Sequence, residues 1–107
     1  MSEQFRRTDP RYDRRIEVEI SVGGSTQQAM TRNISIGGMY VEATEAIPVE
    51  TEVRIRFKVP SQPEPIEVTG QVRWVEQEAS PGVIGIGVRF NGLRAREVWA
   101  LNRFFQT

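Results

Sequence analysis

The sequence predicts an all-β fold, namely a six-stranded antiparallel β-barrel with one helix at its C-terminal end. Three observations lead to this fold class. Apolar and polar residues alternate with a period of two in short segments, which is typical of half-buried strands. Turns that contain glycine or proline separate these segments, and the period becomes helical only after Asn91-Gly92. Short, regularly spaced strands followed by a terminal helix indicate a barrel whose helix covers one opening.

The 107 residues suffice for one hydrophobic core, and no repeat or linker divides them. We therefore expect one barrel domain over residues 16–107. In front of it, residues 1–15 are polar and rich in arginine, and Pro10 disfavours a helix there. With only Phe5 and Tyr12 to bury, this N-terminal arm is expected to be flexible until something holds it.

The alternation is clean from Ile16 to Val22, where every second residue is apolar. The glycine pair that follows predicts a hairpin into a second, more polar strand. In the fifth segment Trp74 has the parity of the apolar residues, which predicts that its side chain lies in the core. The expected strands are residues 16–22, 26–33, 39–43, 53–59, 66–74 and 84–90, and the expected helix spans about residues 93–105.

Two polar patterns flank the first hairpin. Arg11 and Arg15, with three residues between them, end at the first strand, while Asn33, Ser35 and Gly38 form an Asn-x-Ser-x-x-Gly stretch before the third. Because the hairpin brings the second strand back beside the start of the first, we expect the two patterns to face each other. Arginine pairs bidentately with phosphate and with guanine O6 and N7, and asparagine and serine bond base edges. Glycine lets a ligand come close. These residue types suit a ligand with phosphates and purine edges.

Each pattern alone has a simpler interpretation. The arginine pair fits a solvated charged tail, and the Asn-x-Ser-x-x-Gly stretch fits a turn whose side chains cap their own backbone. The arm also offers a second register with the same spacing, Arg7 and Arg11. We prefer Arg11 and Arg15 because Arg15 leads directly into the first strand.

The composition excludes several kinds of catalytic and metal-binding site. The chain has no Cys and no His, which excludes disulfides, thiol nucleophiles, thiolate or imidazole metal sites and Ser-His or Cys-His dyads. No clustered pair of carboxylates is visible, so we expect neither a metal site nor an enzyme. No apolar run approaches the roughly 20 residues of a membrane span, and no secretory signal is visible. A cytoplasmic protein without membrane contact is the expectation.

The two patterns together resemble the signature of the PilZ domain family, and residues 70–75 and 84–90 look like the last two strands of that family. The resemblance implies a six-stranded barrel of PilZ type that is a receptor for the bacterial second messenger cyclic di-GMP. It implies that the arginines grip phosphates and guanine edges, that the asparagine and serine contact a guanine, and that the glycines give backbone room. The implied ligand-binding residues are Arg11, Arg14, Arg15, Asn33, Ser35, Gly37 and Gly38.

We therefore expect a single-domain receptor or adaptor that binds cyclic di-GMP, needs no other cofactor, and signals to a partner protein by ordering its arm. It would be a monomer or a ligand-linked dimer. One alternative is a PilZ-like barrel that has lost nucleotide binding and acts only as a protein–protein interaction module. Another is a small barrel that binds single-stranded nucleic acid through Arg54, Arg56 and Lys58. The formal net charge of +0 and the core parity of most aromatics argue against DNA or RNA binding.

Overall fold

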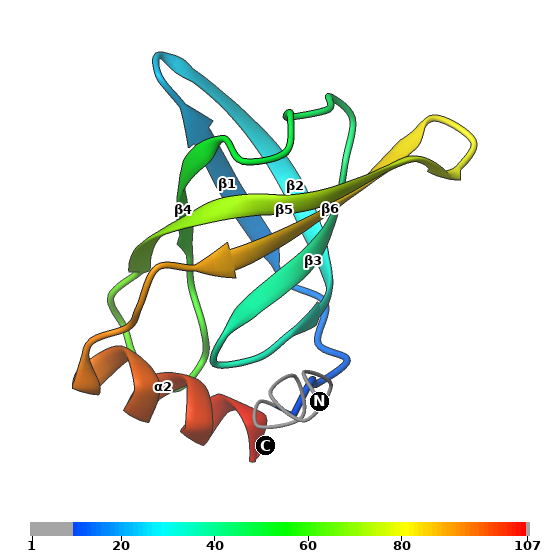
Figure 1. Cartoon of the computed structure of the whole chain (residues 1–107). Helices are drawn as coiled ribbons and strands as arrows, with labels where there is room; N and C mark the ends of the chain where they lie inside the picture. Colours follow the sequence, from blue (N-terminus) through cyan, green and yellow to red (C-terminus); the bar gives the residue numbers. More distant parts are fainter. Residues whose placement is uncertain (1–9, 107) are drawn as a thin grey trace, which may run out of the picture.

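Six strands close into a barrel in the computed structural model, which describes residues 10–106 (Figure 1). The elements are β1 (Glu17–Val22), β2 (Ser25–Ile34), β3 (Gly38–Ala43), β4 (Glu52–Phe57), β5 (Ile66–Ser80), β6 (Val83–Phe90) and α2 (Ala95–Phe105). Neighbouring strands follow the order β1-β2-β3-β6-β5-β4, and β4 pairs back to β1. Every pair is antiparallel, so the predicted fold class is confirmed. The part of the predicted arm before residue 10 lies outside the described residues.

The alternation of the strands builds the core. Val18 and Ile20 in β1 are almost fully buried, and the buried Ala29 of β2 lies opposite Val18. At the closing seam Ile20 faces the equally buried Ile55 of β4, so the two strands share one apolar layer. The opposite parity of β4 carries the exposed Arg54, as the period of two predicts.

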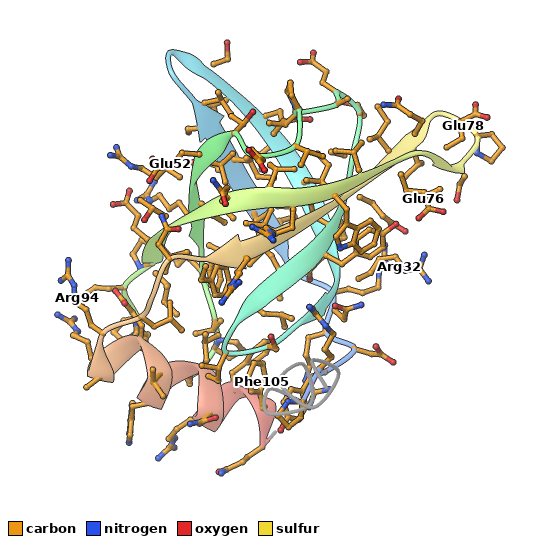
Figure 2. All side chains as sticks on the ribbon, viewed as in Figure 1. Arg32, Glu52, Glu76, Glu78, Arg94 and Phe105 are labelled. Carbon is orange, nitrogen blue, oxygen red and sulfur yellow. The ribbon has the colours of Figure 1, made fainter. Side chains whose placement is uncertain are left out.

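Helix α2 lies across one end of the barrel, and Arg94 and Phe105 mark its two ends (Figures 1 and 2). Its first turn is closed by Glu97, whose Oε1 accepts the N–H of Arg94 at 2.8 Å. One face buries Leu101 and Phe104 against the barrel, as an amphipathic helix requires. The predicted helix is confirmed, although it begins at Ala95 and not at residue 93. No helix in the described part of the chain is long and apolar enough to cross a membrane.

Strand β5 departs from the predicted pattern. It runs to Ser80, and its last residues pair with β6 in a hairpin that projects beyond the barrel (Figure 1). A β-bulge shifts its register between Val72 and Trp74. Because one extra residue reverses the facing of the side chains that follow, Trp74 is 49% exposed. The expectation that Trp74 lies in the core is wrong.

Candidate functional site

The described part of the arm lies between the end of β2 and the end of α2. Tyr12 exchanges two backbone hydrogen bonds with Ile34: its N–H donates to the Ile34 carbonyl at 2.9 Å, and its carbonyl accepts the Ile34 N–H at 3.0 Å. The Tyr12 ring stacks on Phe105, with centroids 4.1 Å apart and planes 11° from parallel. These contacts hold residues 10–15 beside the Asn-x-Ser-x-x-Gly stretch.

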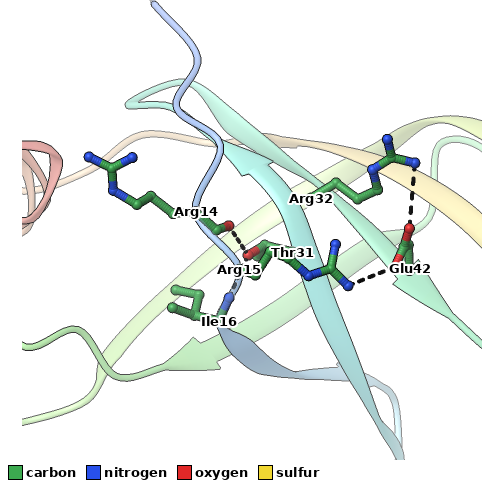
Figure 3. Close-up of polar contacts among 6 residues, drawn as sticks. All are labelled: Arg14, Arg15, Ile16, Thr31, Arg32 and Glu42. Carbon is green, nitrogen blue, oxygen red and sulfur yellow. Dashed lines mark hydrogen bonds and ion pairs between the residues drawn. The ribbon is translucent and has the colours of Figure 1, made fainter.

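Thr31 of β2 ties the arm to the barrel at a second place (Figure 3). Its side chain is 0% exposed, and its Oγ1 donates to the carbonyl of Arg14 at 2.6 Å while accepting the N–H of Ile16 at 2.8 Å. The Arg14 guanidinium turns toward α2, where Nη2 donates to the carbonyl of Phe105 at 3.0 Å. Arg14 is thus directed to the helix and away from the other predicted ligand-binding residues.

Arg11 and Asn33 come together as the sequence predicts. Arg11 Nη1 donates to Asn33 Oδ1 at 2.9 Å, across 22 positions of the chain. Both side chains line a surface cavity of about 450 Å³, which is within the range of about 300–1,000 Å³ that small-molecule sites occupy. Ser35 and Gly37 complete this wall of the cavity.

Ser35 and the glycines shape the loop that carries this wall. Ser35 is 1% exposed, and its Oγ accepts the N–H groups of Gly37 at 3.0 Å and Gly38 at 3.2 Å. The side chain therefore closes its own turn, as the simpler interpretation of the stretch states. A Cβ on Gly38 would overlap the carbonyl oxygen of Val88 in β6, so only glycine lets β3 approach β6 here.

Arg15 lies outside the cavity lining, on the neighbouring face. Its Nη2 forms an ion pair with Glu42 Oε1 at 3.1 Å, and the same carboxylate accepts Arg32 Nη1 at 3.5 Å (Figure 3). Arg14 and Arg15 point in opposite directions from the arm, the first toward the helix and the second toward β3. The two arginines of the predicted pair, Arg11 and Arg15, therefore do not converge in this structure.

A second part of the cavity lining was not predicted. It consists of side chains and backbone from β3, β5 and β6, namely Tyr40, Arg73, Trp74, Gly87 and Arg89. Tyr40 and Trp74 stack with centroids 4.9 Å apart and planes 18° from parallel. The signal in the sequence was Gly85-x-Gly87, whose missing side chains leave room on the outer face of β6 for both rings.

A hydrogen bond to the carboxylate of Glu76 holds the hydroxyl of Tyr40 in place. Its hydroxyl donates to Glu76 Oε1 at 2.8 Å, on the side of the molecule where Figure 2 also labels Arg32. Burial, followed by the hydrogen bond to Glu76, raises the pKa of Tyr40 above its ordinary value. The phenol therefore stays a neutral donor at physiological pH and holds its ring against Trp74. Within the described residues no group of three or more acidic side chains is arranged to hold a metal ion.

The PilZ domain family matches the sequence over residues 5–106. The chain belongs to this family. PilZ domains form a family of cyclic di-GMP receptors, and they are binding and adaptor domains that carry out no catalysis. The family assignment agrees with the closed barrel and its terminal helix.

The solved structures that resemble the fold include the following two. The inhibitor of motility of Bacillus subtilis (MotI/DgrA) superposes with a TM-score of 0.78 at 18% identity over 94% of this chain, which spans 48% of that protein. The PilZ domain of CeSA from a cellulose-synthesizing bacterium superposes with a TM-score of 0.63 at 19% identity, covering 91% of this chain and 95% of that one. No curated protein sequence matches the chain.

Proposed function

We propose that this PilZ domain is a non-enzymatic receptor for cyclic di-GMP that binds in the cavity beside Arg11 and Asn33 and signals to a partner protein. The observation that carries the proposal is the hydrogen bond between these two residues at the edge of that cavity. It joins an arginine fork, which suits phosphate and the guanine Hoogsteen edge, to an amide that suits a base edge. The ligand would replace this bond by its own.

The remaining predicted residues take distinct parts in this proposal. Gly37 gives the ligand access to the backbone, while Ser35 and Gly38 hold the loop in shape. Arg15 would have to leave Glu42 to reach a phosphate, which its 57% exposed side chain permits. Arg14 anchors the arm to α2 at Phe105. Ligand binding would therefore hold the arm more firmly against the barrel, and a partner protein would bind the surface that the ordered arm forms.

Isothermal titration calorimetry with cyclic di-GMP at tens of micromolar protein tests the proposal. The wild-type chain should release heat. Arg11→Ala should weaken binding at least about tenfold, because it removes a charged hydrogen bond worth about 1.5–3 kcal/mol, and Asn33→Ala should weaken it about two- to tenfold, because a neutral hydrogen bond contributes about 0.5–1.5 kcal/mol. Arg54→Ala, on the outer face of β4, is the matched control and should bind like wild type. Absence of heat with the wild-type chain at low salt overturns the proposal.

Two further variants test which two arginines form the ligand-binding pair. Arg15→Ala should abolish most of the binding and Arg7→Ala should not; the reverse result would assign the pair to Arg7 and Arg11.

A second candidate is a barrel that binds protein alone. Two observations favour it: the Ser35 hydroxyl is already used within its own turn, and Arg15 is already paired with Glu42. This candidate predicts a normally folded chain that gives no heat with the nucleotide and retains its protein partner when Arg11 is replaced by alanine.

A further inference from the structure

Helix α2 has two faces of different character. Leu101 and Phe104 pack against the barrel, whereas the other face of the helix is turned away from it (Figure 1). Arg96, Trp99 and Arg103 lie together on this outer face, because residues three and four positions apart share one side of a helix. All three side chains are exposed. We call these three residues the outer stripe of α2.

Trp99 lies outside both the core and the lining of the cavity. Its side chain is 55% exposed, although tryptophan is on average a well-buried residue. The other exposed large apolar side chains of the described residues are Val49, in the loop before β4, and Trp74, which lines the cavity. The fold therefore leaves one large ring in water on α2, and covering such a ring favours association with a second surface.

The two arginines of the outer stripe flank this ring. The guanidinium carbon of Arg103 lies 5.0 Å from the centroid of the Trp99 ring. A guanidinium stacked on an aromatic face can still pair bidentately with a carboxylate, and no carboxylate of the described residues forms an ion pair with Arg103. Arg96 pairs with Glu64 at 3.3 Å, but both side chains are exposed, so this pair is weak and easily exchanged. The stripe thus combines an uncovered ring with an arginine whose charge is not neutralised.

The charges around the outer stripe favour a protein as its partner. Glu64 lies beside Arg96, and Glu97 closes the first turn of the same helix, so a nucleic acid or an anionic membrane would meet two acids here. A membrane-binding helix also needs a broad apolar face, and the apolar face of α2 is already packed on the barrel. A protein surface can place single carboxylates opposite the arginines and keep clear of the acids.

We propose that the outer stripe of α2 is the docking site for the partner protein, with Trp99 in an apolar pocket and Arg103 paired with an aspartate or glutamate at its rim. Tryptophan and arginine are the residues most enriched among those that dominate binding at protein interfaces. The control of this site by the nucleotide rests on the proposed function. The stripe ends two residues before Phe105, where the arm contacts the helix through Tyr12 and Arg14, so an arm held by cyclic di-GMP steadies the docking site.

Photo-crosslinking in the cells that produce the chain locates the partner. p-Benzoylphenylalanine replaces Asn102, which is exposed beside Trp99 and Arg103, in the full chain. The crosslink should join one protein at a segment that contains aspartate or glutamate, and the same label in place of Arg54 on β4 should not capture that protein. Absence of a crosslink, equal capture from both positions, or crosslinks only to nucleic acid, lipid or a second copy of the chain overturns the proposal.

Calorimetry with the purified, crosslink-identified protein measures the contribution of the stripe. Trp99→Ala and Arg103→Glu should each lower the affinity at least about 30-fold, as removal of a dominant interface residue does. Exchange of the partner's crosslinked carboxylate for lysine should restore the binding of Arg103→Glu. Arg54→Glu is the matched control and should bind like wild type, and far-ultraviolet circular dichroism checks that each variant is folded. Wild-type affinity in both Trp99→Ala and Arg103→Glu overturns the proposal.

The docking site and the nucleotide receptor fail in different ways. Trp99→Ala and Arg103→Glu should bind cyclic di-GMP like wild type, because neither residue lines the cavity. If the wild-type chain binds the nucleotide but its complex with the partner does not depend on Trp99 or Arg103, the docking site is overturned and the receptor proposal stands. If the wild-type chain gives no heat with cyclic di-GMP but its complex depends on both residues, the receptor proposal is overturned and the docking site stands.

Discussion

The carboxylate of Glu42 pairs with both Arg15 and Arg32 on the outer face of the barrel. An arginine paired in this way must break its ion pair before it can bind a phosphate, so the pair opposes ligand binding. The magnitude is small, since Arg15 is 57% exposed and exposed pairs contribute about 0–1 kcal/mol. Glu42 is therefore a modest competitor for Arg15.

Replacing Glu42 tests this competition. Glu42→Gln removes the charge and keeps the side-chain size, so Arg15 is released and cyclic di-GMP should bind up to about fivefold more tightly. Calorimetry at low salt measures the change, and Glu19→Gln on β1 is the control at a strand position away from the cavity. A weaker affinity in Glu42→Gln would contradict the competition and would mean that Glu42 holds Arg15 in position for the ligand.

At the scale of elements, the junction of the arm with β2 depends on one hydroxyl. The Thr31 Oγ1 satisfies the carbonyl of Arg14 and the N–H of Ile16 in a fully buried position. Thr31→Val keeps the shape but leaves both backbone groups without their partner, so the free energy of unfolding should fall by about 1–3 kcal/mol. Urea denaturation measures it, with Thr26→Val at an exposed position of β2 as a control that should stay within about 0.5 kcal/mol of wild type. Equal stability of the two variants would contradict the role of Thr31.

The strands could be predicted where burial imposes a period of two, as from Ile16 to Val22, since one face must enter the core. The bulge at Arg73 could not, because an inserted residue has no local signature and reverses the facing of every side chain after it. The proximity of Arg11 and Asn33 followed from hairpin topology alone. The direction of Arg14 did not, since it depends on where the end of α2 docks.

At the scale of the whole molecule, the arm connects the cavity to the terminal helix. Arg11 lines the cavity, while the next residue, Tyr12, stacks on Phe105 at the end of α2. A ligand that draws Arg11 inward therefore also presses Tyr12 onto the helix, and the coupling is reciprocal: a helix that holds the arm raises affinity. If the binding-competent arm is only partly populated, the apparent affinity falls by that fraction.

This coupling predicts that Tyr12→Ala lowers the affinity for cyclic di-GMP about three- to tenfold although Tyr12 does not line the cavity. Hydrogen exchange followed by mass spectrometry supplies the deciding measurement. In the wild-type chain the ligand should increase protection of the amides in both residues 10–15 and Ala95–Phe105, because the stack fixes the arm and the helix together. In Tyr12→Ala the ligand should protect only residues 33–38 beside the cavity, whereas Trp99→Ala on the outer face of α2 should behave like wild type. If the amides of α2 exchange equally fast with and without the ligand in the wild-type protein, ligand binding is not coupled to the helix through the arm.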